Sequence, residues 1–206
     1  MIIAIDGPAA AGKGTLAKRI AATLQLPYLD TGILYRATAK RVLEAGGNPE
    51  DVSTALAATQ NLSAADLTRN DLRDAATSKA ASQVASIAAV RQALLDFQRH
   101  FGTAHGAVLD GRDIGTIIFP QADVKLFVTA SVEARAQRRY QEFCTRGETV
   151  ALAEVIADVQ ARDEADRTRT AAPLMMARDA TLIDTTDMDA DAAFARALEL
   201  IKEKTA

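Results

Sequence analysis

A glycine-rich loop directly after the first strand-like segment restricts most strongly what this chain can fold into. The apolar run 2–5 is followed, after Asp6, by residues 7–13, which fit the pattern G-x-x-x-x-G-K. Glycines in this pattern let backbone N–H groups turn toward phosphate oxygens, the next helix directs its positive end at them, and Lys13 adds a charge for the β- and γ-phosphates. The loop therefore predicts a nucleoside-triphosphate site. Its predicted binding residues are Gly7, Pro8, Ala9, Ala10, Ala11, Gly12, Lys13, Gly14 and Thr15.

A second phosphate-binding pattern, the dinucleotide fingerprint G-x-G-x-x-A, also fits the chain from Gly12 to Ala17. In that fingerprint the first glycine lies at the end of the strand, whereas Gly12 comes seven residues after Ile5. A lysine between the glycines is typical of the triphosphate loop. A nucleoside triphosphate is therefore the favoured ligand, with a dinucleotide or a purely structural loop as the alternatives.

The residue after the loop lysine bears on the metal ion. Serine or threonine usually stands there and binds Mg²⁺, but this chain has Gly14, with Thr15 one place later. The G-K-G-T ending resembles that of nucleoside monophosphate kinases, in which water and phosphate oxygens hold most of the metal. Asp110, after the apolar run 107–109, is the candidate for an indirect role at Mg²⁺ together with Thr15. Its alternative role is that of a turn residue before Gly111.

Short apolar segments rich in β-branched residues predict the strands of the sheet. They are continuous rather than alternating, which is typical of parallel strands covered by helices on both faces. These segments are 2–5, 27–29, 107–109, 124–128 and 181–183. Helical patterns occur at 13–24, 33–45, 132–145, 150–162 and 189–204, and residues 48–106 read as further helices without a strand. The alternation predicts a three-layer α/β fold with a five-stranded parallel sheet.

Composition excludes several classes of function. The chain carries 24 basic and 27 acidic residues, a net charge of −3, which does not favour binding to nucleic acid. The one cysteine, Cys144, excludes a disulfide framework and a cysteine zinc cluster. We expect His100 and His105, on either side of Gly102 before the third strand, to be surface or turn residues. No run of about 18 apolar residues is present. We expect a cytoplasmic monomer with no membrane partner.

Arginines dominate the cations of the second half of the chain. Between Lys125 and Lys202 there are nine arginines and no lysine, and the guanidinium fork suits bidentate phosphate contacts. Helical spacing places two sets of side chains each on one helix face: Arg135, Arg138 and Arg139, and then Arg162, Asp166 and Arg169. Phosphate binding is favoured for Arg138, Arg139, Arg162 and Arg169. The alternative is a solvated helix surface with weak arginine–carboxylate pairs, and it is favoured for Arg135 and Arg146. The carboxylates available for such pairs are those of Glu133, Glu142, Asp163 and Glu164.

A phosphate loop combined with such arginines indicates phosphoryl transfer, which needs little covalent help and much charge neutralisation. A GTPase would require an N-K-x-D motif, which the sequence lacks. A regulatory nucleotide-binding module is the other alternative, but it leaves the arginines without a role.

Almost from end to end, the chain resembles bacterial cytidylate kinases. The resemblance rests on the phosphate loop together with D-T-G-x-x-Y-R at 30–36, A-S-Q-V-A at 81–85, V-R-Q-A-L-L at 90–95, D-G-R-D-I-G-T at 110–116 and the segment 162–174. It implies transfer of the ATP γ-phosphoryl group to CMP or dCMP, with Mg²⁺. Adenylate, uridylate and shikimate kinases are the alternatives with other small acceptors.

The resemblance also implies roles for individual residues. Catalytic roles would go to Lys13, Arg112, Arg138, Arg139, Arg162 and Arg169. In the CMP site, the acceptor phosphate would be held by Arg36, Arg112 and Arg169 next to Asp30 and Thr31; the cytosine would be read by Ser82, Arg91 and Asp113; the sugar would meet Arg162 and Asp166. An ion pair with Arg112 is the alternative role of Asp113.

The resemblance divides the chain into three parts. A P-loop core would comprise 1–30, 107–137 and 170–206, a helical acceptor-binding domain 31–106, and a short lid with its flanking helix 138–169. Typical family members carry a small β-sheet insert in the acceptor-binding domain. Residues 61–80 are short and polar here and read as helical, so we expect the insert to be truncated.

Overall fold

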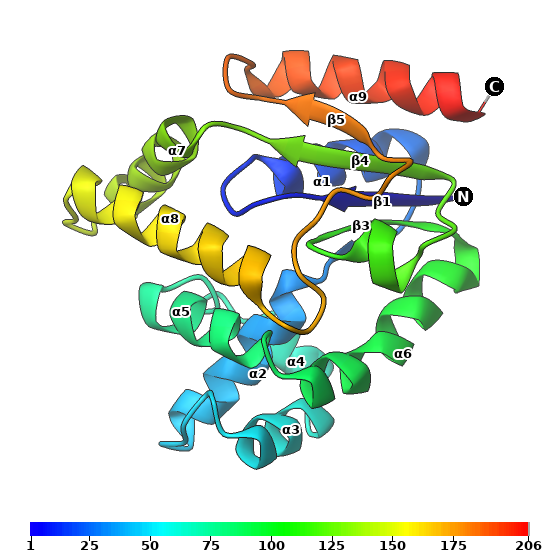
Figure 1. Cartoon of the computed structure of the whole chain (residues 1–206). Helices are drawn as coiled ribbons and strands as arrows, with labels where there is room; N and C mark the ends of the chain where they lie inside the picture. The colour runs from blue at the N-terminus through cyan, green and yellow to red at the C-terminus, as the bar shows by residue number, and fades with distance from the viewer. Residues whose placement is uncertain (206) are drawn as a thin grey trace.

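The computed structural model describes residues 1–205, and a single parallel sheet forms its centre. The strands are β1 (Ile2–Asp6), β2 (Tyr28–Asp30), β3 (Ala107–Gly111), β4 (Val124–Thr129) and β5 (Thr181–Asp184), hydrogen-bonded in the order β2-β3-β1-β4-β5 (Figure 1). All four pairings are parallel. The predicted five-stranded α/β fold is confirmed.

Helices cover both faces of the sheet and make three layers. Helices α1 (Lys13–Leu24) and α9 (Ala190–Thr205) lie on one face, where Leu16 and Leu200 pack against Ile3. Helix α6 (Ala88–His105) and the short π-helix η1 (Ile114–Ile118) lie on the other, against Ala4 and Leu109. Successive strand residues therefore point into two separate cores, which explains why the strands are apolar throughout.

The chain between β2 and β3 contains helices joined by loops and no strand. It forms α2 (Gly32–Glu44), α3 (Val52–Gln60), α4 (Ala64–Leu67), α5 (Ala75–Val84) and then α6. Asp51 and Asp74 cap α3 and α5 by accepting hydrogen bonds from the Thr54 and Thr77 N–H groups at 2.8 and 2.6 Å. These helices share an apolar cluster of their own, so the expectation that residues 61–80 contain no small sheet agrees with the structure.

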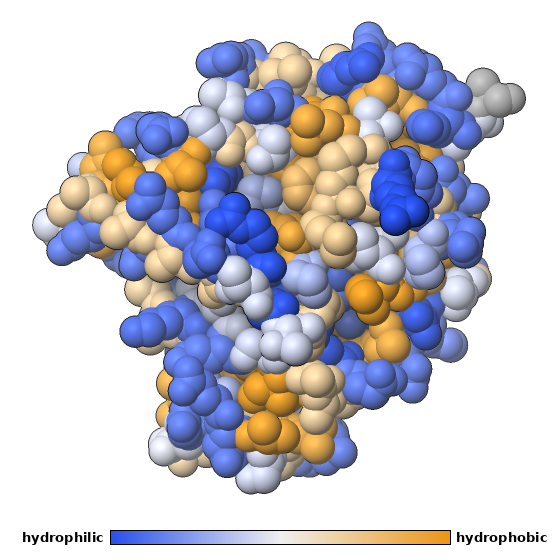
Figure 2. Space-filling model, in the orientation of Figure 1, coloured by the Kyte–Doolittle hydropathy of each residue, from blue (hydrophilic) through white to orange (hydrophobic). Residues whose placement is uncertain are grey.

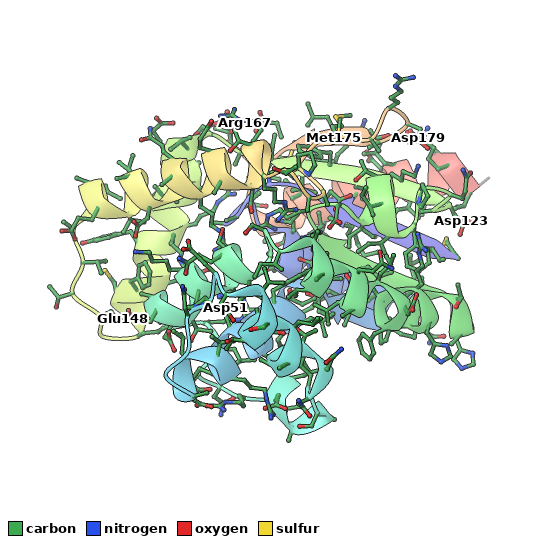
Figure 3. The ribbon with its side chains drawn as sticks, turned by 60° about the horizontal axis from the view of Figure 1, so that its bottom comes forward. Asp51, Asp123, Glu148, Arg167, Met175 and Asp179 are labelled. Atoms are coloured by element: carbon green, nitrogen blue, oxygen red, sulfur yellow. The ribbon has the colours of Figure 1, made fainter. Side chains whose placement is uncertain are left out.

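Two helices come after β4 and form an antiparallel pair. Helix α7 (Val132–Thr145) ends before Gly147, whose φ of +76° suits glycine, and α8 (Leu152–Thr168) returns beside it through a small apolar cluster. Glu148 marks the loop between them, far from the sheet (Figure 3). Among the helices of residues 1–205, none is long and apolar enough to cross a membrane.

The expected turn at His100 and His105 is wrong, because α6 continues through both residues, but both are exposed at the surface. The glycine between them suggested a turn but has a packing role. A Cβ atom on Gly102 would lie 2.4 Å from Cζ of Phe119, so only glycine lets α6 approach this ring.

Candidate active site

The phosphate loop connects β1 to α1 and holds its lysine in a folded position. A Cβ atom on Gly7 would lie 1.9 Å from the Val128 carbonyl oxygen, so the loop requires glycine there. The Lys13 Nζ atom donates a hydrogen bond to the Pro8 carbonyl at 2.7 Å, and the residue is 5% exposed. The loop residues 7–15 are thus brought together around the start of α1, as the sequence pattern predicts.

Burial disfavours the charge of Lys13. Together with the nearby Arg112 guanidinium, it lowers the pKa of the Lys13 ammonium group to about 7, while Asp110 and Asp6 oppose the shift. A bound phosphate would supply the missing negative charge. The loop is therefore electrostatically prepared for an anion.

The carboxyl end of β3 places Asp110, Arg112 and Asp113 next to the phosphate loop, because β3 pairs with β1. Asp6, at the end of β1, fixes the turn after β3: its two carboxylate oxygens accept hydrogen bonds from the Ile114 and Gly115 N–H groups at 2.8 and 2.7 Å. Burial raises the pKa of Asp6 to about 6. Sequence reasoning assigned no role to Asp6, although a carboxylate between a buried strand and the loop was a signal for one.

Helix α8 brings a second set of charged groups to this edge of the sheet. The Asp166 carboxylate accepts a hydrogen bond from Nε of Arg112 at 2.8 Å and lies 3.6 Å from Nη1 of Arg169. Nε of Arg162 and Nη2 of Arg169 are buried, and neither has a hydrogen-bond partner within the described chain. Unpaired buried donors of this kind indicate a ligand that supplies acceptors.

Arg36 and Arg162 extend the positive cluster toward α2. Burial, together with the charges of neighbouring arginines, lowers the pKa of Arg36 to about 9 and that of Arg162 to about 10. Arg36 donates to the Ser78 hydroxyl at 2.6 Å, and Arg139 of α7 reaches the same oxygen at 3.5 Å. Strongly hydrophilic side chains gather near the centre of this face, beside α8 (Figure 2). The cations exceed their local counter-charges, which is the electrostatic condition for binding an anion.

Asp113 forms a buried ion pair with Arg91 of α6 and not, as the sequence left open, with Arg112. Arg112 instead contacts Asp166. Arg91 also donates a hydrogen bond to the Ala85 carbonyl at 3.0 Å. Ala85 follows Ser82 by about one helical turn at the end of α5. The structure thus joins Arg91 and Asp113 beside the arginine cluster, and Ser82 lies on α5 one helical turn after Ser78.

Three predicted residues are tied to partners beside the cluster. Arg138 donates to the Thr185 hydroxyl at 3.0 Å and to its carbonyl at 2.5 Å, near the end of β5. Thr31 donates its hydroxyl to the Asp110 carbonyl at 2.9 Å. Asp30 pairs with Arg73 at 2.7 Å. Arg138 therefore faces the β5 side of the phosphate loop, whereas Arg139 faces α5.

For Arg135, the expected arginine–carboxylate pair agrees with the structure, whereas the expected solvated surface position is wrong. Its side chain is buried and pairs with Asp163 of α8 at 2.5 Å, and it also donates to the Ala9 carbonyl of the phosphate loop at 3.3 Å. Arg135 lies on the helix face that Arg139 shares, and this spacing was the available signal. Arg146, at the end of α7, donates to the Arg73 carbonyl at 3.0 Å.

The donors near the loop fit a magnesium ion held chiefly by its nucleotide. Within residues 1–205, no three His, Cys, Asp or Glu residues are grouped to hold a metal ion. Asp110 is 7% exposed and faces the loop, where burial and the nearby Asp30 charge raise its pKa to about 6. Thr15 is exposed in the first turn of α1. Mg²⁺ commonly takes one or two carboxylates along with waters and substrate phosphates, which this set can supply.

Comparison with known proteins places the chain in a family. The sequence model of the family described as cytidylate kinase matches residues 3–203. The chain is 59% identical to a cytidylate kinase of Acidiphilium cryptum over 98% of this chain and 96% of that one, and 56% identical to one of Paramagnetospirillum magneticum over 98% of each. A crystal structure of an uncharacterized protein from Eubacterium ventriosum shares the fold, with a TM-score of 0.57 and 13% identity over 98% of each chain. The chain therefore belongs to the cytidylate kinase family.

Proposed function

We propose that this chain transfers the γ-phosphoryl group of ATP to CMP or dCMP and releases ADP with CDP or dCDP. The observation that carries the proposal is the under-neutralised arginine cluster opposite the loop lysine. The pKa values of Lys13, Arg36 and Arg162 all lie below their ordinary values, and buried N–H groups of Arg162 and Arg169 lack partners within residues 1–205. Two anions, the ATP triphosphate and the acceptor phosphate, would satisfy these groups.

The phosphate loop and Lys13 hold the donor in this mechanism. Backbone N–H groups at the start of α1 bind the phosphates, and Lys13 leaves the Pro8 carbonyl to contact the transferred group. Asp110 would hold a nucleotide-bound Mg²⁺ through its waters, with Thr15 nearby, and the ion would supply neutralisation of the charge that develops during transfer. Arg138 lies at the β5 side of the loop and Arg139 faces α5, and both would close over the triphosphate.

The arginine cluster holds the acceptor. Arg36, Arg112 and Arg169 bind the CMP phosphate, while Arg162 and Asp166 orient the sugar and border the transferred group. Two phosphates repel each other, so bringing them in line for transfer requires cations on both sides. The burial of these arginines also excludes water, which favours transfer to CMP over hydrolysis.

Asp113 and Arg91 are the proposed readers of the base, with Ser82. Arg91 donates a hydrogen bond to Oδ2 of Asp113, whereas Oδ1 of Asp113 has no hydrogen-bond partner in the described part of the chain. This oxygen can accept a hydrogen bond from the exocyclic amino group of cytosine. Uracil presents a carbonyl oxygen at that place, which would leave two acceptors facing each other.

The direct test is ADP release from ATP and Mg²⁺ with CMP, dCMP, UMP, AMP, GMP and shikimate in turn. We expect turnover with CMP and dCMP and little with the other acceptors. Turnover confined to a different acceptor would assign the site to another small-acceptor kinase. No turnover with any of them would instead favour a non-catalytic nucleotide-binding module.

Replacing Asp113 by asparagine is expected to reduce the preference for CMP over UMP. Asparagine keeps the shape but can present its NH₂ group to the uracil carbonyl. We expect the ratio of the two kcat/KM values to fall roughly 10- to 100-fold, because a hydrogen bond to a charged group contributes about 1.5–3 kcal/mol. Steady-state kinetics with both nucleotides measure this ratio.

The matched control is Asp123→Asn, at the opposite end of β1. Asp123 accepts a hydrogen bond from the Ile2 N–H group at 2.6 Å and lies at the edge of the molecule (Figure 3). This variant should keep the ratio of the wild-type protein. An Asp113→Asn protein that lost CMP and UMP turnover equally would contradict base reading.

A further inference from the structure

Tyr28 brings a hydroxyl group to the phosphate loop from a neighbouring strand. Tyr28 lies on β2 opposite Val108 of β3, so it shares a sheet face with Asp110, two residues farther along β3. Its hydroxyl donates a hydrogen bond to Oδ1 of Asp110 at 2.8 Å. Within residues 1–205 this is the only hydrogen bond to the Asp110 carboxylate. The phenol therefore determines which way the two carboxylate oxygens point.

The same hydroxyl lies next to Gly14, the residue after the loop lysine. Other phosphate loops carry serine or threonine at this position. A Cβ atom on Gly14 would lie 3.7 Å from the Tyr28 hydroxyl oxygen and 3.9 Å from Oδ2 of Asp110. Both are ordinary contact distances. The space next to Gly14 is thus bordered by the phenol hydroxyl and by the free oxygen of the carboxylate.

We propose that Tyr28 is a positioning residue that takes the place of the hydroxyl Gly14 lacks, and that it presents Oδ2 of Asp110 to a water molecule on Mg²⁺. The inference rests on the proposed function, since it concerns the nucleotide-bound metal of that reaction. A carboxylate held by one hydrogen bond keeps its other oxygen in a single direction, and groups that orient a metal-binding carboxylate commonly contribute roughly 10- to 100-fold to metal affinity.

The test is Tyr28→Phe, which removes the hydroxyl and keeps the ring. We expect the Mg²⁺ concentration for half-maximal turnover to rise about tenfold, while kcat at saturating Mg²⁺ and the KM for CMP stay within about twofold. Calorimetry provides a readout without turnover. The gain in ADP affinity on adding Mg²⁺ should fall about tenfold, whereas the affinity for metal-free ADP should not change.

A rescue variant separates this role from a merely structural one. Gly14→Ser in the Tyr28→Phe protein restores a hydroxyl from the loop side, and the contacts at Gly14 leave room for the Cβ atom that carries it. We expect the Mg²⁺ concentration for half-maximal turnover of the double variant to return most of the way to the wild-type value. The matched control is Thr103→Val, which removes a hydroxyl bonded at 3.0 Å to the Arg99 carbonyl within α6.

Two results would overturn the proposal. One is a Tyr28→Phe protein with the Mg²⁺ half-saturation and ADP affinity gain of the wild type; the other is a double variant with no recovery. Failure of the proposed function is distinguishable, because a wild-type protein without CMP turnover still allows the calorimetric comparison with ADP.

Discussion

Replacing Lys13 by alanine is expected to lower kcat about 100-fold or more, the effect of removing one preorganised charge-stabilising donor. Lys13 is the only side-chain cation within the phosphate loop, and its folded-back contact with Pro8 keeps it at the site before ATP arrives. ADP release with CMP under saturating conditions measures the loss. The control is Lys202→Ala on the exposed side of α9, which should retain wild-type turnover.

The same variant tests the charge state of the loop. Burial and the Arg112 charge lower the pKa of Lys13 to about 7 in the free protein, and the negative charge of the triphosphate would raise this pKa again. Binding of Mg²⁺–ATP at pH 8 should therefore take up protons, which calorimetry in buffers of different ionisation enthalpy measures. The Lys13→Ala protein should show no such uptake. Persistent uptake or unchanged turnover would contradict the role of this lysine.

The sheet and the phosphate loop were predictable because local patterns determine them. Continuous apolar runs such as Ile2–Ile5 are typical of strands covered on both faces, and the glycine and lysine spacing specifies the loop after the first strand. The helical spacing of Arg162, Asp166 and Arg169 likewise predicted one shared face, and these three residues do converge at the site.

The partners of the charged groups were not predictable from spacing. Arg138 and Arg139 are neighbours in the chain, yet one contacts Thr185 and the other Ser78, because consecutive helix residues point about 100° apart. Arg135 shares the face of Arg139 but meets Asp163, since α8 returns beside α7. Helix spacing predicts which side chains share a face. Whether that face contacts solvent, a carboxylate or a ligand depends on the element packed next to it.

Asp113 illustrates the same limit over a longer distance. Its neighbour Arg112 was the obvious partner in sequence, but Arg112 points to α8 and Arg91 comes from α6, 22 residues earlier in the chain. The turn that separates these two directions is held by Asp6 through the Ile114 and Gly115 N–H groups. A contact of this kind depends on the residue register of the β1–β3 pair. Sequence patterns predict that the two strands exist, but not which of their residues lie opposite each other.

Replacing Arg112 by alanine should reduce kcat about 100-fold or more and raise the KM for CMP. Its guanidinium donates Nε to Asp166 at 2.8 Å and Nη1 to the Gly111 carbonyl at 3.2 Å, and Nη2 has no hydrogen-bond partner in residues 1–205. Two bonds thus fix the guanidinium and leave one N–H group free, and the Arg112 charge is close enough to Lys13 and Arg162 to lower the pKa of both. Steady-state kinetics that separate kcat from KM for CMP measure the loss.

Two further variants distinguish geometry from charge at this position. Arg112→Lys keeps the charge but not the planar fork, so we expect it to recover less than about a tenth of the lost kcat, given that lysine acts as a point charge. Arg167→Ala removes an exposed arginine on the outer side of α8, 68% exposed and paired with Glu164, and should leave kcat and KM unchanged (Figure 3). Full turnover in Arg112→Ala would show that the acceptor phosphate is held elsewhere. Full recovery in Arg112→Lys would mean that net charge, not the fork fixed by Asp166, neutralises the transferred group.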